Sequence, residues 1–415
     1  MELIKTLYKD TRIFLKWIAI AIVLGGVGGV LGSVFHILVD LATETRQNND
    51  FLIWLLPIGG LLIVFLYRFA HATRGVDTNR VIEAADTDNK SIPIVMAPLI
   101  FVSTIITHLF GGSAGREGAA LQIGGSVGYF FGKLIKLDKK DMHIIVMTGM
   151  SSLFAALFGT PITATFFAVE VISVGVMHYA GLVPCIVSSL VSSYIAKLFG
   201  LHPVNFADIM LPEITTVLAL KAILLAVMCA IVSVVFCLSL EKTEHLFKKY
   251  LKNPYLRIFI GGVLIVALTM ICGTRDYNGA GMDVISNAML GKVNGEAFIL
   301  KMLFTVITVA AGFKGGEIVP TFFIGATFGC AVAPIIGLDP SLGAAIGFIA
   351  LFCSVVNCPV ASVILAIEVF GSSPMLIFAL VCCISYMTSG YTGLYHSQRI
   401  VYSKFGEKYI NIHTK

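Results

Sequence analysis

Two glycine-rich segments of the chain each carry an acidic residue, and the two acids lie 200 residues apart. The segments read GGSAGREGAALQIGG at 111–125 and AGFKGGEIVPTFFIG at 311–325, with Glu117 and Glu317 at matching places. A glycine-rich turn that leads into a helix presents free backbone N–H groups and the positive end of the helix dipole, which together bind anions. An acid at that point can block the anion site or carry a proton. We therefore predict that Glu117 gates an anion site and takes up a proton. The alternatives are that Arg116 and Glu117 pair with each other or with helix ends, and that the glycines of either segment serve close packing through small residues.

The composition places these segments in a membrane protein. Of 415 residues, 57% are hydrophobic and 13% are charged, and the mean hydropathy is +0.91. Soluble domains carry about 25% charged residues. Apolar runs long enough to cross a bilayer recur between residues 14 and 392. We predict an all-α polytopic membrane protein with a single membrane transport domain over 1–415 and no soluble regulatory domain. The first run, 18–39, is not followed by a cleavage site, so we expect a retained helix.

Basic residues fall into four clusters, which predict how the chain is oriented. The clusters lie at 5–16, 133–140, 242–257 and 399–415, and the net charge is +5. Because basic residues favour cytoplasmic loops, we expect all four clusters and the short N- and C-terminal ends on the cytoplasmic face. We expect a multi-pass protein of a prokaryotic plasma membrane, in contact with the lipid bilayer and binding no nucleic acid. Charge scattered only for solubility is the alternative.

The chain repeats itself at a lag of about 200 residues. The segments GMSSLFAALFGTPITATFFAVEVI at 149–172 and GFIALFCSVVNCPVASVILAIEVF at 347–370 share a glycine, a proline and a glutamate at equal spacing. We divide the chain into half 1, about 14–200, and half 2, about 214–400. A duplicated membrane domain favours a transporter or channel whose site is formed between the halves by broken helices. The matched acids Glu170 and Glu368 are expected to bond backbone groups or helix ends.

Other chemistries have weaker support in the sequence. Nine cysteines and nine histidines are dispersed without metal-site spacing, so we predict no metal ion and no cofactor. An intramembrane lipid phosphatase that uses Ser113, Arg116 and Glu117 is an alternative from another class, but such an enzyme would be expected to carry more arginines or a histidine beside the loop. We predict that the chain is not an enzyme, and that Arg116 is structural and holds an acid or backbone carbonyls.

Four motifs, in order along the chain, resemble those of a known family. GREGAALQIGGSVG at 115–128, TPITATFFAVE at 160–170, GGEIVP at 315–320 and GLYHS at 393–397 resemble the CLC family of anion channels and anion/proton antiporters. The resemblance implies two inverted-topology repeats with broken and tilted helices, and a homodimer with one pore per subunit. It also places Glu117 at the family's external gating glutamate.

The same resemblance implies where an anion binds. The segment GVDTN at 75–79 falls at the family's first anion loop, the segment around Glu317 forms the central anion site, and Tyr395 matches a tyrosine whose hydroxyl faces the anion. The first-loop register stays open among residues 76–79. The implied anion-binding residues are Val76, Thr78, Asn79, Gly115, Gly118, Gly316, Ile318, Val319 and Tyr395.

Departures from the family pattern narrow the expected substrate. The first loop lacks a serine, Val171 stands where chloride antiporters carry an internal glutamate, and Glu317 is an extra acid. These features resemble the fluoride/proton antiporter branch, in which an acid matching Glu317 contributes to coupling, although Ala119 replaces the usual proline and Val319 an expected threonine. We expect fluoride export in exchange for protons; a chloride/proton antiporter or a passive chloride channel is the alternative. Fluoride is strongly hydrated, so its site must offer many donors.

Overall fold

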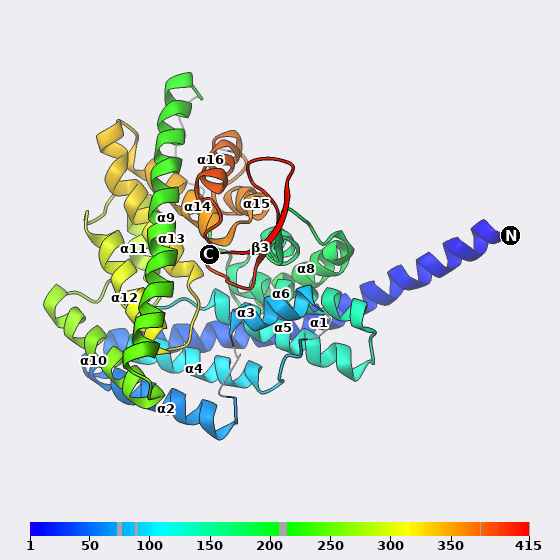
Figure 1. The fold of residues 1–415 in the computed structure, drawn as a ribbon, viewed down its shortest axis with the longest axis horizontal. Coiled ribbons are helices and arrows are strands. Elements are labelled where there is room, and N and C mark those ends of the chain that lie inside the picture. The colour runs from blue at the N-terminus through cyan, green and yellow to red at the C-terminus, as the bar shows by residue number, and fades with distance from the viewer. Residues whose placement is uncertain (73–76, 88–89, 207–213, 374, 415) are drawn as a thin grey trace.

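The structure is a computed structural model that describes residues 1–72, 77–87, 90–206, 214–373 and 375–414, which form sixteen α-helices. Figure 1 shows these helices packed at widely differing tilts, with the N-terminal end of α1 projecting from the bundle. The first eight are α1 (Glu2–Asn48), α2 (Leu56–Phe69), α3 (Thr78–Asp86), α4 (Met96–Phe110), α5 (Glu117–Leu134), α6 (Lys139–Phe158), α7 (Pro161–Glu170) and α8 (Leu182–Leu198). The second eight are α9 (Thr216–Tyr250), α10 (Pro254–Cys272), α11 (Met282–Met289), α12 (Ala297–Ala311), α13 (Ile318–Val332), α14 (Pro340–Val356), α15 (Pro359–Phe370) and α16 (Met375–Thr388).

Seven helical stretches in the described residues are long and apolar enough to cross a membrane. They are Ile4–Asn48, Asp50–Phe69, Lys139–Phe158, Tyr179–Leu198, Thr216–Tyr250, Pro254–Cys272 and Ile318–Ile336. The helix expected over 18–39 is the middle part of α1, which extends to 47 residues. Other apolar helices, such as α4, α12 and α15, are too short to span alone. The prediction of a helical polytopic fold with broken helices is confirmed.

The second set of helices repeats the order and the ends of the first. α4 and α12 are each followed by a glycine with positive φ, Gly111 at 90° and Gly312 at 105°. α7 and α15 each begin on a proline, which suits the first helical position because the N–H group there has no partner within the helix. Equivalent turns therefore start and stop equivalent helices in both halves.

Close glycine contacts hold the helices of each half together. α5 packs on α6, and α13 packs on α14. A Cβ at Gly124 would lie 2.3 Å from the Gly149 carbonyl oxygen, and a Cβ at Gly325 would lie 2.3 Å from that of Gly347. Small residues are what such a close approach requires. The lag of 200 residues pairs Gly325 with Gly125, but Gly124 holds the equivalent place in the structure, because Gly125 faces α3 instead.

Glu170 and Glu368 join the two halves reciprocally. The Glu170 carboxylate, at the end of α7, accepts hydrogen bonds from two first-turn N–H groups of α15 at 2.8 and 3.1 Å. The Glu368 carboxylate, near the end of α15, accepts from two first-turn N–H groups of α7 at 2.7 and 3.0 Å. Each acid thus caps the positive end of the other half's helix, as expected from their symmetry.

A small three-stranded sheet, which the all-α prediction did not include, fastens the end of the chain. β1 (Ser173–Val174) pairs in parallel with β2 (Arg399–Tyr402), which pairs antiparallel with β3 (Tyr409–His413). Gln398 donates to the carbonyls of Val171 and Val356, both at 2.9 Å. These contacts fix the turn that carries Tyr395 against both halves. The strands are too short for a period-two pattern to be recognised in the sequence.

Candidate functional site

The two glycine-rich turns meet at an antiparallel bridge between Gly115 and Gly316. The Gly115 N–H donates to the Gly316 carbonyl at 2.6 Å, and the Gly316 N–H donates to the Gly115 carbonyl at 2.7 Å. A Cβ at Gly118 would lie 2.8 Å from the Gly316 Cα, so a side chain there would push the turns apart. The glycines therefore bring together the N-termini of α5 and α13, which begin at Glu117 and Ile318.

This bridge corrects one expectation about the anion site. The N–H groups of Gly115 and Gly316, which were predicted to bind an anion, are each donated to a carbonyl in the structure. They are engaged because the two turns pair with each other. First-turn N–H groups have no acceptor within their own helix, and those of Gly118, Ile318 and Val319 belong to this class. These three amides are the remaining backbone candidates.

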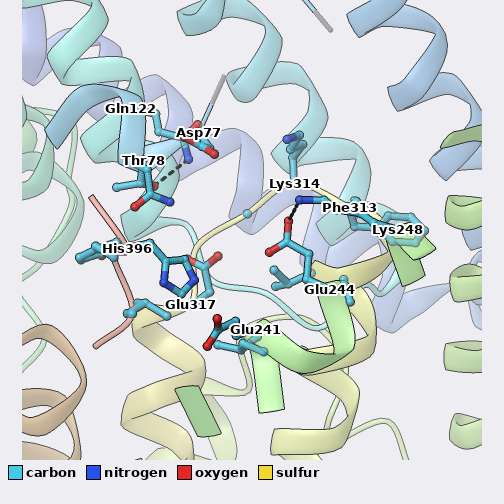
Figure 2. Close-up of a pocket in the computed structure, with 18 of the residues that line it drawn as sticks. Asp77, Thr78, Gln122, Glu241, Glu244, Lys248, Phe313, Lys314, Glu317 and His396 are labelled. Carbon is cyan, nitrogen blue, oxygen red and sulfur yellow. Dashed lines mark hydrogen bonds and ion pairs between the residues drawn. The ribbon is translucent and has the colours of Figure 1, made fainter. Parts of the chain in front are cut away.

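Glu117 and Glu317 line two different cavities. The Glu117 cavity has a volume of about 410 Å³ and the Glu317 cavity a volume of about 330 Å³. Val319 lines the first and Gly315 lines the second, so the turn before α13 and its first residues reach both. Figure 2 shows Glu317 near the centre of its cavity, with Thr78 above it and Glu241 below it in this view. The two matched acids thus line separate cavities, although the turns that carry them are paired.

Arg116 holds Glu117 in a buried network. Glu117 is only 2% exposed, and its Oε2 accepts a hydrogen bond from the Arg116 backbone N–H at 3.0 Å. The Arg116 Nε lies 3.8 Å from the other carboxylate oxygen. The same guanidinium pairs with Asp40 of α1 and lies 3.1 Å from His36 Nε2. Arg116 therefore holds acids, as predicted, and links the N-terminus of α5 to α1.

The alternative phosphatase arrangement has two of its three residues engaged elsewhere. The Ser113 Oγ lies 3.0 Å from Thr305 Oγ1, and the Ser113 N–H donates to Thr308 Oγ1 at 3.1 Å. The Arg116 guanidinium is committed to Asp40. Neither group is poised for a phosphate.

The Glu317 cavity gathers the candidate residues of the first loop. Thr78 begins α3, whose N-cap Asp77 accepts from the Arg80 N–H at 3.1 Å. The Asn79 Oδ1 accepts from the Ser397 N–H at 3.0 Å, which leaves the side-chain NH₂ group as its donor. Both Thr78 and Asn79 line the cavity with Glu317. The other candidate of this loop, Val76, lies outside the described residues.

Tyr395 brings an unused hydroxyl to the same cavity. The residue is 2% exposed and lines the Glu317 cavity. Among the described residues, its hydroxyl has no hydrogen-bond partner. The Thr414 Oγ1 donates to the Tyr395 carbonyl at 2.6 Å, so the end of the chain holds this residue in place. A buried hydroxyl without a partner is suited to an anion.

The cavity also contains polar residues that sequence reasoning did not single out. They are Gln122, Glu241, Glu244, Lys248, Lys314 and His396. Gln122 stands within the GREGAALQIGG motif, five residues after Glu117, so its spacing could have drawn attention to it. Glu241 and Glu244 lie beside the basic cluster at 242–257, which indicated only a cytoplasmic helix end. Glu244 pairs with Lys248 one helical turn on.

Comparison with known proteins identifies relatives along most of the chain. The family model described as voltage gated chloride channel matches residues 58–390. A chloride/fluoride channel protein of Pseudomonas syringae pv. tomato is 32% identical, over 94% of this chain and 87% of that protein. An H(+)/Cl(-) exchange transporter of Vibrio cholerae is 24% identical, over 86% of this chain and 82% of that protein.

Solved structures of two antiporters share this fold. The crystal structure of a CLC-type fluoride/proton antiporter has 31% sequence identity and a TM-score of 0.88, covering 93% of this chain and 98% of that chain. A slow cyanobacterial Cl−/H+ antiporter, at 19% identity, has a TM-score of 0.76 and covers 90% of this chain and 94% of that chain. The chain therefore belongs to the voltage gated chloride channel family, the CLC proteins, which transport ions and include anion/proton antiporters.

Proposed function

We propose that this protein exports fluoride from the cytoplasm in exchange for protons. One observation carries the proposal. The two glycine-rich turns are bridged to each other, and the acid of each turn, Glu117 or Glu317, lines a different cavity. Such an arrangement gives each solution one acid, which the exchange of an anion for a proton requires. Relatives at 31% and 32% identity whose names include fluoride support that anion as the substrate.

The basic clusters support an orientation for the two cavities. Lys248 and Arg257 belong to the cluster at 242–257 and line the Glu317 cavity. Under the positive-inside rule the Glu317 cavity then opens to the cytoplasm and the Glu117 cavity to the outside. We place the protein in a prokaryotic plasma membrane, with both termini cytoplasmic, as one transport domain per subunit of a homodimer with one pore in each subunit.

Fluoride then enters the Glu317 cavity and exchanges water for protein donors. Thr78, Asn79 and Tyr395 supply side-chain donors there. Toward the Glu117 cavity, which Val319 lines, the first-turn amides of α5 and α13 add backbone donors and the positive ends of two helix dipoles. Because dehydration of a small anion is costly, several simultaneous donors are needed to offset it. Gly118, Ile318 and Val319 are the residues whose amides fit this task.

Glu117 controls the outer end of the path. As a carboxylate it competes with fluoride for the same donors, since both are anions. A proton from outside neutralises it, so that it leaves the anion position and fluoride passes. The proton continues to Glu317. This acid takes over the role of the internal glutamate of chloride antiporters, whose position is occupied by Val171 in this chain. We expect the protonation of Glu117 and Glu317 to be coupled, because both carboxylates act on one anion path.

Flux measurements on purified protein in liposomes test this function. Liposomes loaded with fluoride, with the potential clamped, should release fluoride while the external solution becomes alkaline as protons enter. Parallel liposomes loaded with chloride should release their anion more slowly. Faster chloride release with proton uptake would support the chloride/proton antiporter instead. Anion release without proton movement would support a passive channel.

A further inference from the structure

Gln122 contacts Thr78 at the wall of the Glu317 cavity. It lies on α5, is 4% exposed, and lines the same cavity as Thr78, which is 6% exposed. The Gln122 Nε2 donates to the Thr78 Oγ1 at 3.0 Å. The dashed line in Figure 2 marks this bond across the top of the cavity. The contact joins α5, which begins at the gating glutamate, to the first turn of α3.

Because Gln122 is the donor of this hydrogen bond, the hydroxyl hydrogen of Thr78 is not used in it. A hydroxyl has one hydrogen to donate and two lone pairs that accept. The Gln122 N–H occupies one lone pair, so the hydroxyl cannot direct its hydrogen along that line. Among the described residues, the structure records no hydrogen bond that Thr78 Oγ1 donates. A donor in a cavity wall that is not used by the protein is available to a bound anion.

We propose that Gln122 is a positioning residue that keeps the Thr78 hydroxyl aimed at the transported anion. Donation by Gln122 polarises the hydroxyl and strengthens its own donation, because hydrogen bonds in a chain reinforce one another. It also keeps the hydroxyl from turning back toward α5. This positioning role of Gln122 depends on the proposed function in one respect, the identity of the anion as fluoride. Fluoride, as the stronger acceptor, gains more than chloride from a polarised donor.

A purely structural role for Gln122 makes different predictions. α3 packs on α5, so the bond could serve only to join the helices. Loss of the bond would then weaken transport of both anions equally, and its effect would persist when Thr78 had no hydroxyl. A positioning role instead acts through that hydroxyl, so removing it should remove the effect of Gln122. A double-mutant cycle separates the two roles.

The experiment uses Gln122→Met, Thr78→Val and the double variant in reconstituted full-length protein. Gln122→Met should raise the fluoride KM about tenfold, the effect of weakening one hydrogen bond to a charged group, with kcat nearly unchanged. Thr78→Val should raise it at least as much. The double variant should be no worse than Thr78→Val alone, and Gln122→Met should reduce the preference for fluoride over chloride. Thr78→Ser, which keeps the hydroxyl, should behave as the wild type.

Two outcomes would overturn the proposal. One is an equal effect of Gln122→Met with and without the Thr78 hydroxyl; the other is an unchanged fluoride KM in Gln122→Met. If the double variant does not fold, Gln122→Glu decides. The carboxylate of this variant can only accept, so it would take the hydrogen of the Thr78 hydroxyl and raise the fluoride KM above that of Gln122→Met. A wild-type fluoride KM in Gln122→Glu would contradict the role. Asn294→Met, at an exposed amide side chain that lines neither cavity, is the matched control.

Failure of the proposed function would be recognisable separately. A wild-type protein that carries chloride but not fluoride would contradict fluoride export alone. The same cycle of variants, measured with chloride, would still decide whether Gln122 acts through Thr78.

Discussion

One pair of matched glutamates, Glu170 and Glu368, has similar surroundings in the two halves, whereas the other pair, Glu117 and Glu317, does not. Glu170 and Glu368 have closely similar contacts, since each carboxylate accepts from two N–H groups at the start of the other half's helix. Glu117 and Glu317 also hold matched places, yet one lines a cavity beside Arg116 and the other lines a second cavity with Tyr395. Symmetry is kept where both halves need the same helix contact. It is lost where transport needs two unlike ends.

Equivalent helices deliver different charges to the two cavities. α1, the first helix of half 1, supplies Asp40, which pairs with Arg116 beside Glu117. α9, the first helix of half 2, supplies Glu241, Glu244 and Lys248 to the Glu317 cavity. Corresponding helices of the two halves therefore carry different charged side chains. That difference is what makes the path directional in the proposed function.

Replacement of Glu117 should break this comparison most strongly. Glu117→Gln keeps the shape of the side chain but cannot take up and release a proton. We expect proton movement to fall by ~100-fold or more, the scale of a positioned proton-transfer group, while anion movement continues. Proton uptake and fluoride release measured in the same liposomes check this. Glu407→Gln, at an exposed acid between β2 and β3 that lines neither cavity, serves as the control. Normal proton movement in Glu117→Gln would remove the assigned role.

Replacement of Glu317 should have the next largest effect. Glu317→Gln removes the acid that stands in for the missing internal glutamate, but Glu241 and His396 still line the cavity and can bring protons to it. We expect proton movement to fall by about tenfold, which corresponds to about 1.4 kcal/mol. The ratio of protons to fluoride is the measurement. The control is Glu296→Gln, at the exposed N-cap residue of α12, which should keep the wild-type ratio of protons to fluoride. An unchanged ratio in Glu317→Gln would contradict the role assigned to Glu317.

The symmetrical pair should affect stability rather than transport. Glu170→Gln and Glu368→Gln each replace a carboxylate that accepts two backbone N–H groups with an amide that has one acceptor oxygen. Each change should lower the free energy of unfolding by about 1–3 kcal/mol, with the larger loss in Glu368→Gln, because the Glu368 carboxylate also accepts from the Thr163 hydroxyl at 2.6 Å. Denaturation in detergent measures this loss, and the fluoride KM should stay unchanged. A loss of coupling in only one of the two variants would show that these acids are not equivalent.

The repeat made the framework predictable from the sequence. Glycine, proline and glutamate recur at equal spacing, so Glu170 and Glu368 could be expected to bond backbone groups or helix ends. The aligned prolines, Pro161 and Pro359, begin α7 and α15 in the structure. Thr78 and Tyr395, which the motifs singled out, line one cavity, and their contact with an anion stays a prediction. These inferences succeeded because the information lies in local patterns that the two halves share.

Contacts between distant turns could not be predicted in the same way. The pairing of Gly115 with Gly316 depends on how two turns far apart in the chain approach each other, so their N–H groups were wrongly expected to be free. The partner of Gln122 is likewise set by the packing of α3 on α5. The sheet escaped prediction because strands of two to five residues leave no periodic signal.

The smallest expected effect comes from a difference between the ends of α6 and α14. Both helices are followed by a residue with positive φ, Gly159 at 74° and Asn357 at 57°. Only Asn357 has a side chain, and its Oδ1 accepts from Lys404 Nζ at 2.5 Å, a lysine beyond β2 and outside the membrane-spanning helices. Burial of the ammonium group lowers the pKa of Lys404 to about 8.

The sign of the resulting pH dependence follows from that pKa. Between pH 8 and the ordinary pKa of 10.5, the unfolded chain binds a proton at Lys404 that the folded protein has lost, so stability should rise with pH. We expect an increase of about 1–2 kcal/mol once partial exposure is allowed for. Lys404→Met should abolish this rise in denaturation measured across pH 7 to 11, whereas Lys408→Met, at an exposed lysine nearby, should preserve it. An unchanged profile in Lys404→Met would mean that the second half gains no pH sensitivity from this contact and that the two helix ends are energetically alike.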